Sequence, residues 1–173
     1  MRYYRVIVCA LITGGLAGSA EAQTPLLSGF RDFSAELAIR QSVAGAAARL
    51  AVQGCQDILD ELADRSGNPL SRLLASKRTS PVEAFNGLRF VEARDTARCG
   101  AGMTLAYTLA GSPVIGICGA EFSRIFATDR RAAEITLIHE FLHSIGLGEN
   151  PPTSREITQR VVAKCGNQPR GSR

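Results

Sequence analysis

Residues 135–145 divide into an apolar and a polar half when they are projected onto a helix at about 100° per residue. The apolar half holds Ile135, Leu137, Ile138, Phe141, Leu142 and Ile145, and the polar half holds Thr136, His139, Glu140, His143 and Ser144. The apolar half must face a hydrophobic core. The opposite half carries two histidines and a carboxylate but no Lys or Arg, which is typical of the wall of a cleft. We therefore predict a helix that has Asp129 as its N-cap and ends near Ile145, where Gly146 stops it.

The rest of the chain alternates between helical and extended patterns. Gly and Pro in residues 110–113 join two β-type segments and predict a hairpin. The predicted strands are Leu88–Ala93, Leu105–Leu109 and Val114–Cys118. The other predicted helices lie within 34–64, with an interruption near Gly45 or Gly54, and at Leu70–Ser76, Pro81–Asn86, Glu121–Ala127 and Ser154–Lys164. This order predicts an α+β fold in which a small antiparallel sheet packs against helices.

The first residues have the pattern of an export signal. Arg2 and Arg5 give a positive start, residues 6–16 are apolar, and residues 20–22 (Ala-Glu-Ala) offer a cleavage site. We expect a signal peptide at 1–22 and a mature protein that is periplasmic or extracellular, with no stable membrane insertion after cleavage. An uncleaved anchor helix is the alternative, although the apolar stretch is shorter than the roughly 20 residues of a transmembrane helix.

The remaining 23–173 segment has the length of one domain, and we expect it to be a monomer. Residues 23–80 either form the upper half of a cleft or act as an inhibitory prosegment. The chain has a net charge of +4, but its basic residues are scattered and form no stripe. This pattern argues against a nucleic-acid partner.

Four cysteines remain after the expected cleavage, and an even number in an exported protein indicates two disulfides. Four cysteines allow three pairings. Cys99 and Cys118 flank the predicted hairpin, which favours a bond between them. Cys55 and Cys165 would then join an early helix to the last one. A zinc site made of these cysteines is disfavoured because no C-x2-C spacing is present.

The polar half of the predicted helix reads H-E-x-x-H from His139 to His143, and these are the only two histidines. Two histidines one turn apart can bind one Zn²⁺ at about 2.0–2.1 Å. Glu140, about 100° further around, lies off the metal but near a water bound there. The metal lowers the pKa of that water toward about 7, so Glu140 can act as general base and then protonate a leaving amine. Glu134, one turn before His139, is either a partner of a ligand or a plain surface charge.

A catalytic zinc site usually has three protein ligands and a water. Glu149 is the first candidate for the third ligand, because the glycines in residues 146–148 let the chain double back beside the helix. Glu156 is the alternative metal ligand. Thr153 and Glu156 also have the spacing of a capping box, which gives Glu156 a structural explanation.

Residues 139–149 resemble the extended metzincin motif, H-E-x-x-H-x-x-G-x-x-H, of the zincin superfamily of metallopeptidases. The resemblance implies that His139 and His143 are zinc ligands and that Glu140 is the general base. It also implies that Glu149 is the third ligand, at a position where that family usually has His and sometimes Asp. In gluzincins the third ligand is a Glu on a later helix, which would be Glu156 here. The methionine turn that follows the motif in metzincins has no counterpart in this sequence.

The zincin resemblance also implies an edge strand above the active-site helix, along which a peptide substrate adds as an extra strand. Leu105–Leu109 or Val114–Cys118 would be that strand. Tyr107 would then either assist the oxyanion or serve in packing. The motif and the resemblance together predict an exported zinc-dependent metallopeptidase with one catalytic ion and a peptide or protein substrate. The alternatives are a non-catalytic envelope binding protein that contains a metal, and a disulfide-stapled envelope protein without one.

Overall fold

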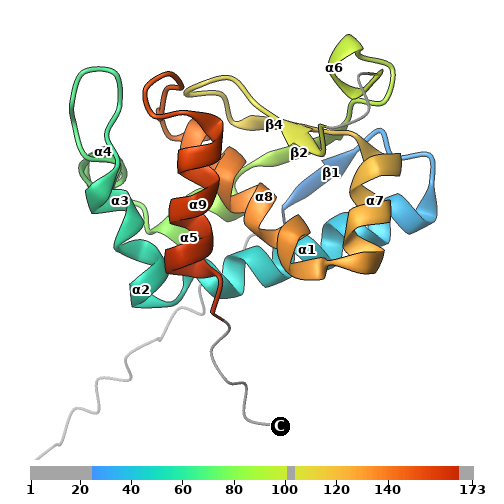
Figure 1. Ribbon diagram of the computed structural model, residues 1–173, viewed down its shortest axis with the longest axis horizontal. Helices are drawn as coiled ribbons and strands as arrows, with labels where there is room; N and C mark the ends of the chain where they lie inside the picture. Colours follow the sequence, from blue (N-terminus) through green and yellow to red (C-terminus); the bar gives the residue numbers. More distant parts are fainter. Residues whose placement is uncertain (1–24, 101–103, 168–173) are drawn as a thin grey trace, which may run out of the picture.

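The computed structural model describes residues 25–100 and 104–167 and shows an α+β fold (Figure 1). The strands are β1 (Leu26–Ser28), β2 (Arg89–Glu92), β3 (Ala106–Tyr107) and β4 (Val114–Ile117). The helices are α1 (Phe33–Leu50), α2 (Gln53–Gln56), α3 (Ile58–Glu61), α4 (Leu70–Ser76), α5 (Pro81–Asn86), α6 (Ala97–Gly100), α7 (Gly119–Thr128), α8 (Arg130–Ser144) and α9 (Ser154–Cys165). The signal peptide expected at 1–22 lies outside the described residues.

The strands form one mixed sheet in the order β1-β2-β4-β3. The predicted hairpin is present, because β3 pairs with β4 in antiparallel register, Ala106 opposite Ile117. The prediction of an antiparallel sheet is wrong for the other pairs, since β1 with β2 and β2 with β4 are parallel. Parallel neighbours need a long crossover, and helices α1 to α5 supply it between β1 and β2. β1 itself was not predicted, because three residues are too few to show an alternating pattern.

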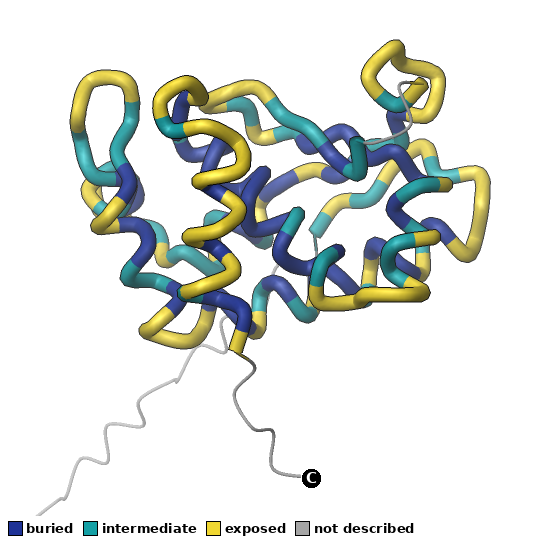
Figure 2. Tube along the Cα trace, viewed as in Figure 1, coloured by how far each residue is buried: buried dark blue, intermediate teal, exposed yellow. Residues whose placement is uncertain are grey.

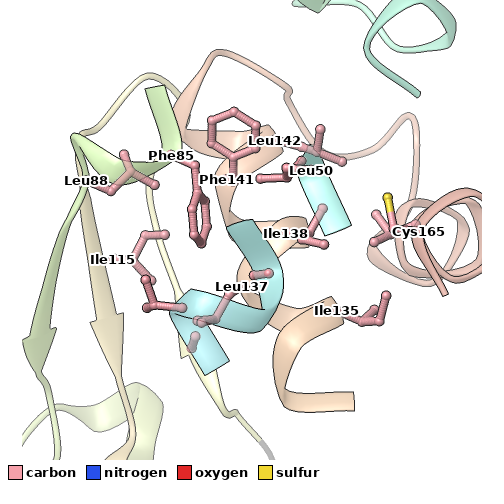
Figure 3. Packing of buried hydrophobic residues seen from close by; sticks show 14 of the residues in the cluster. Leu50, Phe85, Leu88, Ile115, Ile135, Leu137, Ile138, Phe141, Leu142 and Cys165 are labelled. Carbon is pink, nitrogen blue, oxygen red and sulfur yellow. The ribbon is translucent and has the colours of Figure 1, made fainter. Parts of the chain in front are cut away.

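Helix α8 runs through the centre of the molecule, below the sheet and beside α1 in the view of Figure 1. Its N-cap is Asp129, as predicted, and the Asp129 carboxylate accepts a hydrogen bond of 2.9 Å from the Ala132 N–H. Its apolar half enters the core, where Phe141 meets the Phe85 ring edge-on with the centroids 5.7 Å apart (Figure 3). The polar half is buried as well, so α8 is enclosed along most of its length (Figure 2).

A buried ion pair ties α8 to α1. The side chains of Arg49 and Glu134 are almost fully buried, and Arg49 Nε lies 2.7 Å from Glu134 Oε2. Arg49 Nη1 also donates to the carbonyl oxygens of Cys165 at 2.8 Å and Gly166 at 3.1 Å, so one guanidinium joins three helices. Glu134 is therefore neither a partner of a histidine nor a surface charge. Gly45 does not interrupt α1. It leaves room for the Glu134 carboxylate, which occupies the place that a Cβ would take.

Two disulfides join separate elements of the fold, and both have the predicted pairing. Cys55 is bonded to Cys165, which joins α2 to α9 across 110 residues of sequence. Cys99 is bonded to Cys118, which ties α6 to the residue that precedes α7. Within residues 25–100 and 104–167, no helix combines the length and the apolar character needed to cross a bilayer.

Candidate metal centre

Three potential metal ligands meet at the C-terminal end of α8. The two Nε2 atoms of His139 and His143 lie 3.1 Å apart. Glu149 Oε1 lies 3.4 Å from the Nε2 of His143 and 3.9 Å from the Nε2 of His139. Among the described residues these three side chains form a group that could hold a metal ion. The structure therefore brings Glu149, the first candidate for the third ligand, to both histidines.

The turn after α8 delivers Glu149 to this position. Gly146 has φ = +125°, a conformation that side chains disfavour, and it reverses the chain directly after the helix. The N–H of Leu147 then donates to the carbonyl of Leu142 at 3.1 Å, which holds the returning segment against α8. The Glu149 side chain remains 42% exposed, so the group opens toward solvent on its carboxylate side.

Hydrogen bonds on the far side of each imidazole orient the two rings. His143 Nδ1 lies 2.8 Å from the carbonyl oxygen of Leu147, which can only accept, so Nδ1 carries a proton and, when the ring is neutral, Nε2 has a free lone pair. His139 Nδ1 lies 3.0 Å from the Thr158 hydroxyl on α9. A hydroxyl can accept or donate, so it also permits the tautomer in which Nε2 is free. Such outer contacts are typical of histidines that bind a metal.

Burial keeps His139 uncharged. Its pKa is lowered from the ordinary 6.5 to about 4, mainly because burial disfavours the imidazolium and secondly because His143 lies beside it. A neutral imidazole is the form that binds a metal. Near neutral pH His139 is therefore already in the protonation state that coordination requires.

Glu140 lies on the same face of the helix but outside the group of three. Its side chain is buried, and its pKa is raised to about 8, mainly by burial and then by the negative charge of Glu149. The backbone N–H of Thr108 and the charge of Arg98 act in the opposite direction. A carboxyl group so placed, beside a cleft and away from the ligands, can take up and release a proton.

The group lies in an open cleft of about 490 Å³. The edge strand β3 and the segment that follows it form one wall, through Ala106, Tyr107 and Thr108, and the turn at Gly148 forms the other. In Figure 1 strand β4 and the loop that precedes α9 both lie along the upper side of the molecule.

The alternative ligand, Glu156, is not part of the group. Its carboxylate accepts from the backbone N–H of Thr153 at 2.8 Å and completes a capping box at the start of α9. These hydrogen bonds lower its pKa, so it remains a charged cap. The contacts of Glu156 therefore support its role as a helix cap and not as a metal ligand.

Tyr107 lines the cleft, but its ring has structural contacts. The ring packs over Gly116 of β4, and Arg98 Cζ lies over the ring, 5.0 Å from its centroid. Its hydroxyl donates to Thr96 Oγ1 at 3.3 Å. Tyr107 thus has packing contacts at the edge of the cleft.

The donor set can be compared with the geometry that zinc requires. Tetrahedral ligands at about 2.0–2.1 Å from zinc lie about 3.4 Å from one another. The separations of 3.1, 3.4 and 3.9 Å bracket that value. Two imidazoles and one carboxylate, open to solvent on one side, are ligands that zinc and other divalent transition metals accept. His139, His143 and Glu149 are the residues that would hold the ion.

Comparison with known proteins adds no assignment. No protein-family model, no curated protein and no solved structure matches this chain.

Proposed function

We propose that this chain is an exported zinc-dependent peptidase of the zincin type. The observation that carries the proposal is the meeting of His139, His143 and Glu149 at one point in a cleft, with Glu140 on the same wall. The three side chains supply a ligand set, and the fourth supplies a group that exchanges protons. Two disulfides are in keeping with an oxidising compartment outside the cytosol.

The chemistry divides between the ion and the chain. Zinc, when bound, supplies Lewis acidity to the attacking water and to the carbonyl under attack. Glu140, in its carboxylate form, accepts one proton from that water as the C–O bond forms, and passes the proton to the amine nitrogen as the C–N bond breaks. Water is thereby added across the peptide bond, and Glu140 returns to its starting state.

The position of β3 favours an extended peptide as the substrate. In the described sheet β3 is an edge strand, bonded to β4 on one side, and it lines the cleft through Ala106 and Tyr107. An edge strand offers unpaired backbone groups that a peptide can join as a further strand. This agrees with what the zincin resemblance implies. The carbonyl of such a peptide would pass close to His139 and His143.

The alternative of a metal-free, disulfide-stapled envelope protein predicts histidines that face bulk solvent, far from acidic side chains. The structure has His139 and His143 buried at 6% and 7% exposure, with Glu149 within 4 Å of both. The geometry therefore favours a metal-containing protein. Only a measurement of activity distinguishes a non-catalytic metal protein from an enzyme.

We expect the purified exported chain to cleave a random peptide library in a reaction that 1,10-phenanthroline stops and stoichiometric zinc restores. The reason is that removing the ion removes the Lewis acid, while the disulfide-held fold keeps the ligands in place. The measurement is mass spectrometry of the products, with an equally purified Glu140→Gln preparation as the control for contaminating proteases. Cleavage that the chelator leaves unchanged would contradict the proposal. A zinc-loaded chain that cleaves no member of the library would favour the alternative function, a non-catalytic metal protein.

A further inference from the structure

Two arginines line the candidate cleft from different parts of the chain. Arg65 belongs to the loop between α3 and α4, and Arg98 belongs to α6. In Figure 1 that loop and α6 lie at opposite ends of the upper side of the molecule, and the hairpin lies between them. Among the residues that the structure describes, neither guanidinium takes part in an ion pair.

Arg65 is held in place by its loop. The Asp64 carboxylate accepts hydrogen bonds of 2.8 Å from the backbone N–H groups of both Ser66 and Asn68, which fixes the turn. Asp64 also forms a β-bridge with Leu147, so the loop is joined to the turn that carries Glu149. The Arg65 side chain lies against Gly148, where a Cβ would stand 3.0 Å from Arg65 Nε. Its guanidinium is therefore presented beside the third ligand.

Arg98 is held at the other end. The neighbouring Cys99 is bonded to Cys118, which fastens α6 to the core of the fold. The Arg98 guanidinium lies over the Tyr107 ring, with Cζ 5.0 Å from the centroid, and so stands above the edge strand. At this position the positive charge of Arg98 acts to lower the pKa of Glu140.

The charged side chains that line the cleft make both of its ends positive. Its two acidic side chains, Glu140 and Glu149, lie at the centre, where a divalent cation would offset their negative charge. The two arginines are then the uncompensated charges along the path of an extended peptide. Guanidinium groups bind carboxylates through paired hydrogen bonds, and they reject basic side chains by repulsion.

We propose that the cleft selects peptide segments with acidic side chains on both sides of the bond to be cleaved, one recognised by Arg65 and the other by Arg98. This inference rests on the proposed peptidase function, which places the cleaved bond between the two arginines. The recognition itself depends only on the two arginines and can be measured as binding.

The test uses the Glu140→Gln protein, in which bound peptide should not be consumed. Fluorescently labelled peptides of equal length that alternate Ala with Glu, Gln or Lys are titrated by anisotropy, with and without zinc. We expect the Glu peptide to bind most tightly, with a larger preference when zinc is present than when it is absent, and more weakly at high salt. Adding Arg65→Gln or Arg98→Gln should weaken its binding about three- to tenfold each, and adding both should remove most of the preference over the Gln peptide. Arg160→Gln is the matched control, because Arg160 is exposed on α9 and does not line the cleft.

Each other outcome has a defined meaning. Equal binding of the Glu and Gln peptides, or equal effects of the Arg160 and cleft variants, would overturn the inference. A preference for Glu that appears only with zinc and survives both cleft variants would assign acid recognition to the ion, which also overturns it. Loss of the proposed function would look different: no zinc-dependent cleavage by the unmodified chain, with acid binding that still depends on Arg65 and Arg98.

Discussion

Replacing Glu140 by Gln is expected to lower the rate of peptide hydrolysis about 10²- to 10⁴-fold while the protein keeps its zinc. Gln has the shape of Glu but cannot accept the proton of the attacking water. Glu140 is not among the three side chains that meet at the candidate site, so the ligand set is unchanged. The measurement is kcat/KM on a peptide that the unmodified chain cleaves, together with the zinc content of both proteins.

Glu121→Gln is the matched control for the Glu140 variant. The Glu121 carboxylate pairs with Arg124 on the surface of α7, so its loss should change neither the rate nor the zinc content. A Glu140→Gln protein that hydrolyses peptides within a few-fold of the unmodified rate would refute the role of Glu140. A variant that loses zinc would show that Glu140 contributes to binding the ion.

The second large effect concerns stability. Replacing Arg49 by Met is expected to lower the free energy of unfolding by about 3–5 kcal/mol. The variant leaves the buried Glu134 carboxylate without its partner, and the carbonyl oxygens of Cys165 and Gly166 lose their donor. The measurement is equilibrium unfolding in urea with the disulfides intact.

Two further variants test whether the cost arises from the unpaired charge. Arg40→Met removes an ion pair with Glu36 whose Arg40 side chain is 52% exposed, and it should cost no more than about 1 kcal/mol. The double variant Arg49→Met/Glu134→Leu should recover much of the loss, because no buried charge is left. An Arg49 variant as stable as the Arg40 variant would contradict the role given to this pair.

The sequence predicted the helix of the candidate site closely, because several independent signals agree there. The apolar and polar halves of 135–145 gave its orientation, Asp129 its start and Gly146 its end. Such local patterns depend on residues within a turn or two of one another, which a sequence displays directly. The pairing of Cys99 with Cys118 could be inferred for a similar reason, because both flank one hairpin.

The sheet was less predictable because its order depends on contacts between distant segments. β2 pairs with β4 in parallel although residues 93–113 separate the two strands in sequence, and no local pattern records which segments pair or in which direction. The role of Glu134 was missed for the same reason. Its partner, Arg49, is 85 residues away in sequence, and helix projection alone gives no sign of the contact.

One missed residue could have been found. On α9 the buried positions Ile157, Val161 and Cys165 mark an apolar stripe. Thr158 borders that stripe, whereas Glu156 lies on the far side of the helix. Projecting this helix as well would have directed attention to Thr158, whose hydroxyl contacts His139. It would also have counted against Glu156 as a ligand.

The zinc affinity of three matched proteins decides whether His139, His143 and Glu149 together bind a zinc ion. Competition with a chelating dye would be measured for the unmodified chain, for Glu149→Gln and for Glu156→Gln. We predict one zinc ion per chain, a loss of affinity of about 100-fold or more for Glu149→Gln, and no change for Glu156→Gln. A chain that binds no zinc, or one whose affinity falls with Glu156→Gln and not with Glu149→Gln, would contradict this prediction.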